Sequence, residues 1–188
     1  MENKLHNVLI TEKNISSMRK KIKDDYNLKK LLGNNNLDQS QSIRFGNIFQ
    51  DVIKDFACSC GAIVSGEHFL DIYNKGTDVK NNKGHKDMDI FFEYNNVIYY
   101  FECKTNLDLD SEKSKATNKK VIDIIDYLGN REIKKVVGGV LSCWYEKEEK
   151  LTVKVDNVFF MKDLFNILKY EISKDKYYNI MKEYGKLV

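Results

Sequence analysis

One short stretch constrains the fold of this chain more than any other. Residues 86–104 read KDMDIFFEYNNVIYYFECK, in which two apolar runs flank the pair Asn95-Asn96. Asparagine tolerates the positive φ angles of a tight reversal, so this stretch predicts a β-hairpin. The second run is apolar on both of its alternating faces until its last three residues, which predicts a strand buried on both sides. The hairpin is therefore expected in the core of the fold.

The charged residues of this hairpin lie together at its open end. Asp87 and Asp89 open the first strand, and Glu102 and Lys104 close the second. Strand residues two apart share a face, so Glu102 and Lys104 point the same way. Pairing about the turn places Asp87 or Asp89 across from them. Buried carboxylates are costly when unpaired, so either a structural ion pair with Lys104 or a divalent metal must balance them.

An acidic residue two positions before a lysine does not by itself predict a metal site, because 31% of the residues in this chain are charged. Only Glu102-Cys103-Lys104 follows an apolar run and has an aspartate at the start of the preceding strand. This context favours a metal site over a structural ion pair. The same spacing occurs without that context at Glu2–Lys4, Asp78–Lys80, Glu132–Lys134 and Glu148–Lys150.

The two halves of the hairpin together resemble a known catalytic motif. Residues 89–92 (DIFF) and 98–104 (IYYFECK) are similar to the motif of the PD-(D/E)xK nuclease superfamily, which includes type II restriction endonucleases. Met88 stands where the nominal proline of that motif would be. The resemblance implies hydrolysis of phosphodiester bonds that depends on Mg²⁺ as the cofactor.

The resemblance also assigns roles to individual residues. It implies that Asp89, Glu102 and Lys104 are the catalytic residues. The metal ligands would be the carboxylates of Asp89 and Glu102 and the backbone carbonyl of Cys103. Lys104 would orient the attacking water.

The resemblance leaves a further metal ligand open. Many members of the superfamily add an acid from the first core helix, and here Gln50 stands at that position with Asp51 beside it. Glutamine is a weaker ligand than a carboxylate, so Asp87 is the alternative auxiliary residue.

The order of predicted elements is typical of an α/β fold with a mixed sheet and one crossover helix. It matches the order of the restriction-endonuclease-like core, which is helix, three strands, helix, strand. The predicted elements are an amphipathic helix over 43–57, a broken strand within 61–73, the hairpin, a helix from Asp110 or Ser111 to Leu128 that stops at Gly129-Asn130, and a buried strand over 136–145.

A chain of 188 residues fits one domain, here a single nuclease domain over 1–188. Its predicted parts are a helical N-terminal extension (1–42), a catalytic core (43–145) and a C-terminal part (146–188). In the N-terminal extension, a helix over 14–32 is followed by a polar linker over 33–42. The C-terminal part has strand residues in 151–160 and two short helices, 161–170 and 174–185.

The net charge of +3 is too small to indicate nucleic-acid binding by itself. The helix after Lys104 is more informative, because its first residues offer free backbone N–H groups to phosphate. Phosphate contacts are predicted for at least one of four lysines in this region. These DNA-binding candidates are Lys113, Lys115, Lys119 and Lys120.

The sequence contains no apolar run of the roughly 18 residues that a membrane span needs. The N-terminal residues lack the order of a signal peptide, so a cytoplasmic location is expected. The four cysteines are then expected to be free thiols.

The leading hypothesis is a Mg²⁺-dependent endonuclease that cuts double-stranded DNA, of the type II restriction kind. A homodimer is expected, because two-fold symmetry is the simplest way to cut both strands of a palindrome. The first alternative is a repair, phage or transposon nuclease of the same superfamily. The second is a non-catalytic DNA-binding module that retains the fold and uses Glu102 and Lys104 as a structural ion pair.

Overall fold

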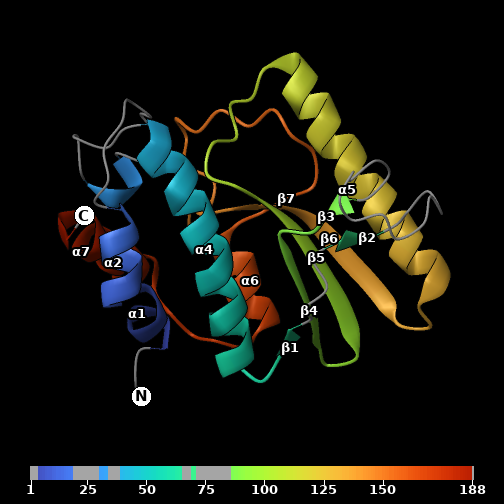
Figure 1. Cartoon of the computed structure of the whole chain (residues 1–188), viewed down its shortest axis with the longest axis horizontal. Helices are drawn as coiled ribbons and strands as arrows, with labels where there is room; N and C mark the ends of the chain where they lie inside the picture. Colours follow the sequence, from blue (N-terminus) through green and yellow to red (C-terminus); the bar gives the residue numbers. More distant parts are fainter. Residues whose placement is uncertain (1–3, 19–29, 34–38, 65–68, 71–85, 188) are drawn as a thin grey trace.

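The computed structural model describes residues 4–18, 30–33, 39–64, 69–70 and 86–187 (Figure 1). Its centre is a mixed sheet of five strands in the order β1-β4-β5-β6-β7. β1, β4 and β5 pair antiparallel, while β6 pairs parallel to β5 and to β7. The strands are β1 (Ile63–Val64), β4 (Ile90–Tyr94), β5 (Val97–Lys104), β6 (Lys135–Ser142) and β7 (Val158–Phe159). The predicted α/β class with a mixed sheet is confirmed.

The predicted hairpin is formed by β4 and β5. Asn95 and Asn96 join the two strands with φ angles of 51° and 62°, the positive values that a tight reversal requires. The register runs from Tyr94 opposite Val97 at the turn to Ile90 opposite Phe101 at the open end. All of β5 also pairs with β6, so β5 is an interior strand of the sheet, which explains its apolar residues on both faces.

Two long helices cover opposite faces of the sheet (Figure 1). α4 (Gln39–Ser59) packs on β1 and β4, and α5 (Ser111–Arg131) packs on β6 and β5. α5 connects β5 to its parallel neighbour β6, as predicted for the crossover helix. The sheet therefore lies between two helical layers, and its core residues belong to one continuous hydrophobic cluster.

α5 begins where the sequence predicts it. The Asp110 side chain is the N-cap and accepts a hydrogen bond of 2.8 Å from the Lys113 backbone N–H. The helix continues to Arg131, past the predicted stop at Gly129-Asn130, and the Glu132 N–H still bonds to the Leu128 carbonyl. An exposed glycine lowers helix propensity but does not end a helix whose other face is packed.

The N-terminal region differs from the prediction in two ways. α1 (Lys4–Leu9) was not predicted, and it forms because Leu5 and Leu9, one helical turn apart, are buried where α1 packs on α4. α4 begins at Gln39, so the end of the predicted linker 33–42 is helical. Those linker residues contain neither glycine nor proline, and nothing in them opposes extension of the helix. α2 (Glu12–Met18) agrees with the start of the predicted 14–32 helix, whose residues 19–29 lie outside the described ones.

The first strand of the hairpin is shorter than predicted. Asp87 does not open it, because β3 (Lys86–Asp87) pairs instead with β2 (Phe69–Leu70) in a separate two-stranded sheet. β4 begins only at Ile90. The broken strand predicted within 61–73 is likewise divided between the two sheets, as β1 and β2.

The C-terminal helices α6 (Met161–Ile167) and α7 (Lys174–Leu187) lie where they were predicted. The Phe45 ring on α4 and the Tyr184 ring on α7 have centroids 6.1 Å apart, so α7 packs into the layer that contains α4. Residues 151–160 contribute only the short strand β7. In the described part of the chain, no helix has the length and apolar character needed to cross a bilayer.

The two sides of α5 give a matched test of the fold. Ile124 is fully buried against the sheet, whereas Ile122 is 57% exposed on the same helix. We expect Ile124→Ala to lower the free energy of unfolding by about 2–5 kcal/mol through loss of burial and cavity formation. Ile122→Ala should change it by less than about 0.5 kcal/mol. Chemical denaturation measures both, and equal effects would contradict the described face of α5.

Candidate active site

The residue just before β4 is an aspartate that lies beside the end of β5. Asp89 directly precedes Ile90, the first residue of β4, whose partner is Phe101. Its carboxylate Oδ2 accepts a hydrogen bond of 2.9 Å from the Cys103 backbone N–H. A carbonyl of a longer β4 would otherwise fill that place in the ladder. Because β4 begins only at Ile90, the Asp89 side chain takes that place beside the end of β5.

Glu102 is the centre of the site. It is only 4% exposed, and both of its carboxylate oxygens have charged partners. Oε1 accepts from the Lys104 ammonium at 2.8 Å, and Oε2 accepts from the Lys120 ammonium at 2.5 Å and from the Tyr100 hydroxyl at 3.1 Å. Tyr100, Glu102 and Lys104 alternate along β5, so the predicted common face of Glu102 and Lys104 is confirmed, and Tyr100 shares it.

Lys120 reaches this site from α5 on the neighbouring layer. Its ammonium also lies 4.0 Å from Asp89 Oδ1, so it approaches both carboxylates. Sequence reasoning grouped it with the surface lysines of α5 and missed this role. Lys120 follows the buried Thr117 by three residues and precedes the buried Ile124 by four, so it lies on the buried side of α5. That spacing could have distinguished it from Lys119, which lies on the exposed side.

The pKa values of the two carboxyl groups are shifted in opposite directions. Burial, followed by repulsion from Glu102, raises the pKa of Asp89 to about 6. Burial also acts to raise the pKa of Glu102, but Lys104 and Lys120 outweigh it and hold that pKa below its usual value. Asp89 is therefore the carboxyl group that takes up a proton first as the pH falls.

The surroundings also shift the pKa values of the Lys104 ammonium and the Cys103 thiol. Burial acts to lower the pKa of Lys104, but attraction to Glu102 outweighs it and raises that pKa, so the side chain remains an ammonium. Burial raises the pKa of the Cys103 thiol well above its usual value. Cys103 thus offers no thiolate ligand at neutral pH, which leaves its backbone carbonyl.

Asp89, Glu102 and Lys104 border a cavity of about 330 Å³ between the N-terminal half of α4, the end of β5 and the segment that follows it. Gln50 on α4 lines this cavity together with Asp89, Glu102 and Lys104. The structure therefore brings the predicted auxiliary Gln50 to the site, while its neighbour Asp51 is exposed and does not line the cavity. The side chain of the other candidate, Asp87, lies outside the described ones.

The oxygen atoms of this site limit which metal ion it could hold. Among the described residues, no group of three or more His, Cys, Asp or Glu side chains is placed to hold a metal. Mg²⁺ needs fewer, because it binds through one or two carboxylates and keeps several waters. Asp89 and Glu102 would supply these carboxylates. The Cys103 carbonyl would add a third oxygen, because the N–H and C=O groups of one strand residue point to the same side and its N–H faces Asp89.

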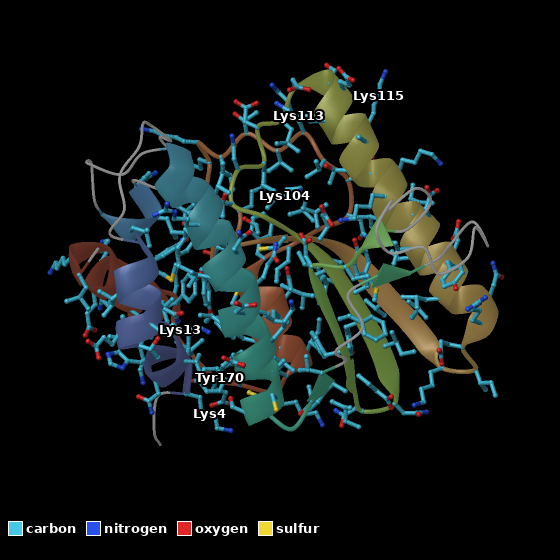
Figure 2. The ribbon with its side chains drawn as sticks, viewed as in Figure 1. Lys4, Lys13, Lys104, Lys113, Lys115 and Tyr170 are labelled. Carbon is cyan, nitrogen blue, oxygen red and sulfur yellow. The ribbon has the colours of Figure 1, made fainter. Side chains whose placement is uncertain are left out.

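The remaining candidate lysines lie apart from the carboxylates. Figure 2 shows Lys113 and Lys115 near the N-terminal end of α5 and Lys104 at the end of β5. Lys113 pairs with its N-cap Asp110 at 3.0 Å, and Lys119 pairs with Asp123 at 3.0 Å. Lys115 is exposed. These three side chains are on the surface of α5, whereas Lys120 is only 20% exposed.

Replacing Asp89 tests the electrostatics of the metal-free site. Because the pKa of Asp89 is about 6 in the fold against an ordinary value of 3.8, ionisation of this group opposes folding. The contribution of Asp89 to the free energy of unfolding should fall as pH rises from about 4 to about 6 and stay lowered above it. We expect Asp89→Asn to stabilise the protein by about 1–3 kcal/mol at pH 8 in a chelator. Thermal or chemical unfolding measures this change.

Asp123→Asn is the control for this measurement, because Asp123 pairs with Lys119 on the same helix and its replacement should bring no gain in stability. A loss of stability in Asp89→Asn at pH 8 would contradict the described environment of Asp89.

Comparisons with models of protein families, with curated proteins and with solved structures find no match to this chain.

Proposed function

We propose that this chain is a Mg²⁺-dependent nuclease that hydrolyses the phosphodiester bonds of double-stranded DNA. One observation carries the proposal. The buried carboxylate of Glu102 and the partly buried carboxylate of Asp89 lie beside Lys104, and all three residues line one cavity. The elements that build the central sheet here follow the order α4, β1, β4, β5, α5, β6, with β2 and β3 paired in a separate sheet, and this helix, three strands, helix, strand order is the one that the motif resemblance implies.

In this proposal, some residues hold the metal ion and another orients the attacking water. Asp89, Glu102 and the Cys103 carbonyl would hold the metal ion. When bound, Mg²⁺ would polarise the phosphate and lower the pKa of a bound water. Lys104 remains an ammonium in this setting, so it acts as a hydrogen-bond donor. It would orient the attacking water and offset negative charge in the transition state, without removing a proton itself.

The finer features rest on the resemblance. A type II restriction enzyme acting as a homodimer would place two copies of this site on the two DNA strands. The surface lysines of α5, Lys113, Lys115 and Lys119, would contact the phosphate backbone and position the DNA without reading its sequence. A repair, phage or transposon nuclease would use the same site without a palindromic target.

One observation favours a second candidate, a non-catalytic DNA-binding module. Glu102 is already satisfied by Lys104, Lys120 and Tyr100 within the protein. Such a cluster could be structural alone. The nuclease remains the first proposal, because a structural ion pair does not require Asp89 to be held beside Glu102 at a cost to its ionisation.

Replacement of Lys104 tests the proposed activity. We expect the wild type to cut linear and supercoiled DNA with Mg²⁺ and to stop in a chelator. Lys104→Ala should lower the cleavage rate by about 10²–10³-fold, because it removes a donor that acts in the transition state. Lys134→Ala is the matched control: it breaks another lysine–glutamate pair, Lys134–Glu93 at 2.7 Å, away from the cavity.

Discrete fragments would support sequence specificity, and a smear would argue against it. Wild-type protein that binds DNA but never cuts it with Mg²⁺ or Mn²⁺ would reject the nuclease in favour of the second candidate.

The ionisation of Asp89 predicts the pH dependence of cleavage. The metal requires the carboxylate, so the rate at low Mg²⁺ should fall as pH drops through about 6, the pKa of Asp89. Proton and metal compete for the same oxygen atoms, so saturating Mg²⁺ should move the midpoint to lower pH. Single-turnover rates between pH 5 and 8 at two Mg²⁺ concentrations measure the shift. A flat profile across this range would contradict the assignment of Asp89 as a ligand.

A further inference from the structure

We propose that Lys120 is a displaceable internal cation: in the metal-free protein its ammonium group occupies the place between Asp89 and Glu102 that the metal takes, and metal binding releases it toward substrate phosphate. This inference rests on the proposed nuclease function and adds to it the regulation of metal loading.

The position of the ammonium supports this role. Lys120 Nζ lies 2.5 Å from Glu102 Oε2 and 4.0 Å from Asp89 Oδ1. Lys104, the other ammonium of the site, pairs with Glu102 on the opposite oxygen, Oε1. A dication bound between Glu102 Oε2 and Asp89 Oδ1 would take the place of this ammonium.

The balance of charge points the same way. Asp89 and Glu102 carry two negative charges, and Lys104 and Lys120 carry two positive charges, so the metal-free cluster is close to neutral. A divalent ion would raise the cluster to about two positive charges within a few ångströms, which is strongly unfavourable at low dielectric. Movement of one ammonium and arrival of a phosphodiester both relieve this excess.

Lys120 is able to move. It reaches the site from a different element, α5, on a flexible four-carbon stem, and its side chain is partly exposed. The metal and Lys120 therefore compete for the carboxylates, and phosphate assists the metal by accepting the ammonium. Metal and DNA binding are then positively coupled, and the free protein holds Mg²⁺ loosely.

The test measures metal affinity without cleavage. Mg²⁺ is titrated by calorimetry into the wild type, Lys120→Met, Lys120→Arg and the control Lys134→Met, which breaks the Lys134–Glu93 pair elsewhere on the sheet. We expect Lys120→Met to bind Mg²⁺ about tenfold tighter or more, because a competing charge is removed. Lys120→Arg, which keeps the charge, and Lys134→Met should remain close to the wild type. A lysine with a merely structural role would give unchanged or weaker metal binding when removed.

A second measurement uses the wild-type protein and does not depend on the folding of Lys120→Met. The side-chain ammonium signals of ¹⁵N-lysine-labelled protein are followed by NMR, with Lys120 assigned from Lys120→Arg and Lys134 as the internal reference. We expect Mg²⁺ to shift the Lys120 signal toward that of a solvent-exposed ammonium and to leave Lys134 unchanged.

The outcomes separate this inference from the proposed function. If Mg²⁺ binds but the Lys120 signal does not move and Lys120→Met gains no affinity, Lys120 is a fixed structural partner, while the nuclease proposal stands. If no protein binds Mg²⁺, displacement is ruled out together with the metal-dependent function, and DNA cleavage should also be absent.

Discussion

Glu102 is an ionised carboxylate inside a folded sheet, and much of the surrounding structure follows from the need to neutralise it. A buried carboxylate without partners would cost several kcal/mol. Lys104 supplies one partner from the same strand, and Lys120 supplies a second from the covering helix. This ties α5 to the end of β5 by charge as well as by apolar packing. The crossover helix is thus part of the site and also part of the scaffold.

Asp89 occupies the less favourable position of the two acids. It lies just before β4 begins, and its carboxylate accepts a hydrogen bond from the Cys103 backbone N–H, which β4 does not pair. Burial and the nearby Glu102 make its ionisation costly, although Lys120 approaches it. A metal ion would relieve this cost directly. Glu102 is therefore stable as a carboxylate within the protein, whereas the negative charge of Asp89 would be stabilised by a bound metal ion.

Much of this arrangement could be predicted from the sequence, because alternation and turn geometry are local rules. The pair Asn95-Asn96 fixed the register, and the register brought Asp89 to Glu102 and Lys104. The position of Gln50 at the site followed from the resemblance, which expects a ligand from the first core helix. Contacts between distant elements were harder to predict. Asp87 was wrongly placed in the hairpin because its strand pairs with Phe69–Leu70, a partner that no local pattern indicates. Lys120 was read as a surface lysine because its carboxylate partners lie on another layer.

The parallel pairing of β5 with β6 has a consequence for the order of folding. All four charged groups of the cluster come from one continuous stretch, residues 89–120, and the β4–β5 hairpin needs only local contacts to form. α5, however, packs mainly on β6, which follows it in the chain. We expect Lys120 to be held firmly in its place once β6 has added to the sheet and closed the crossover. The hairpin would thus bring the two acids together early, and the lysine that balances them would arrive with the last long-range step.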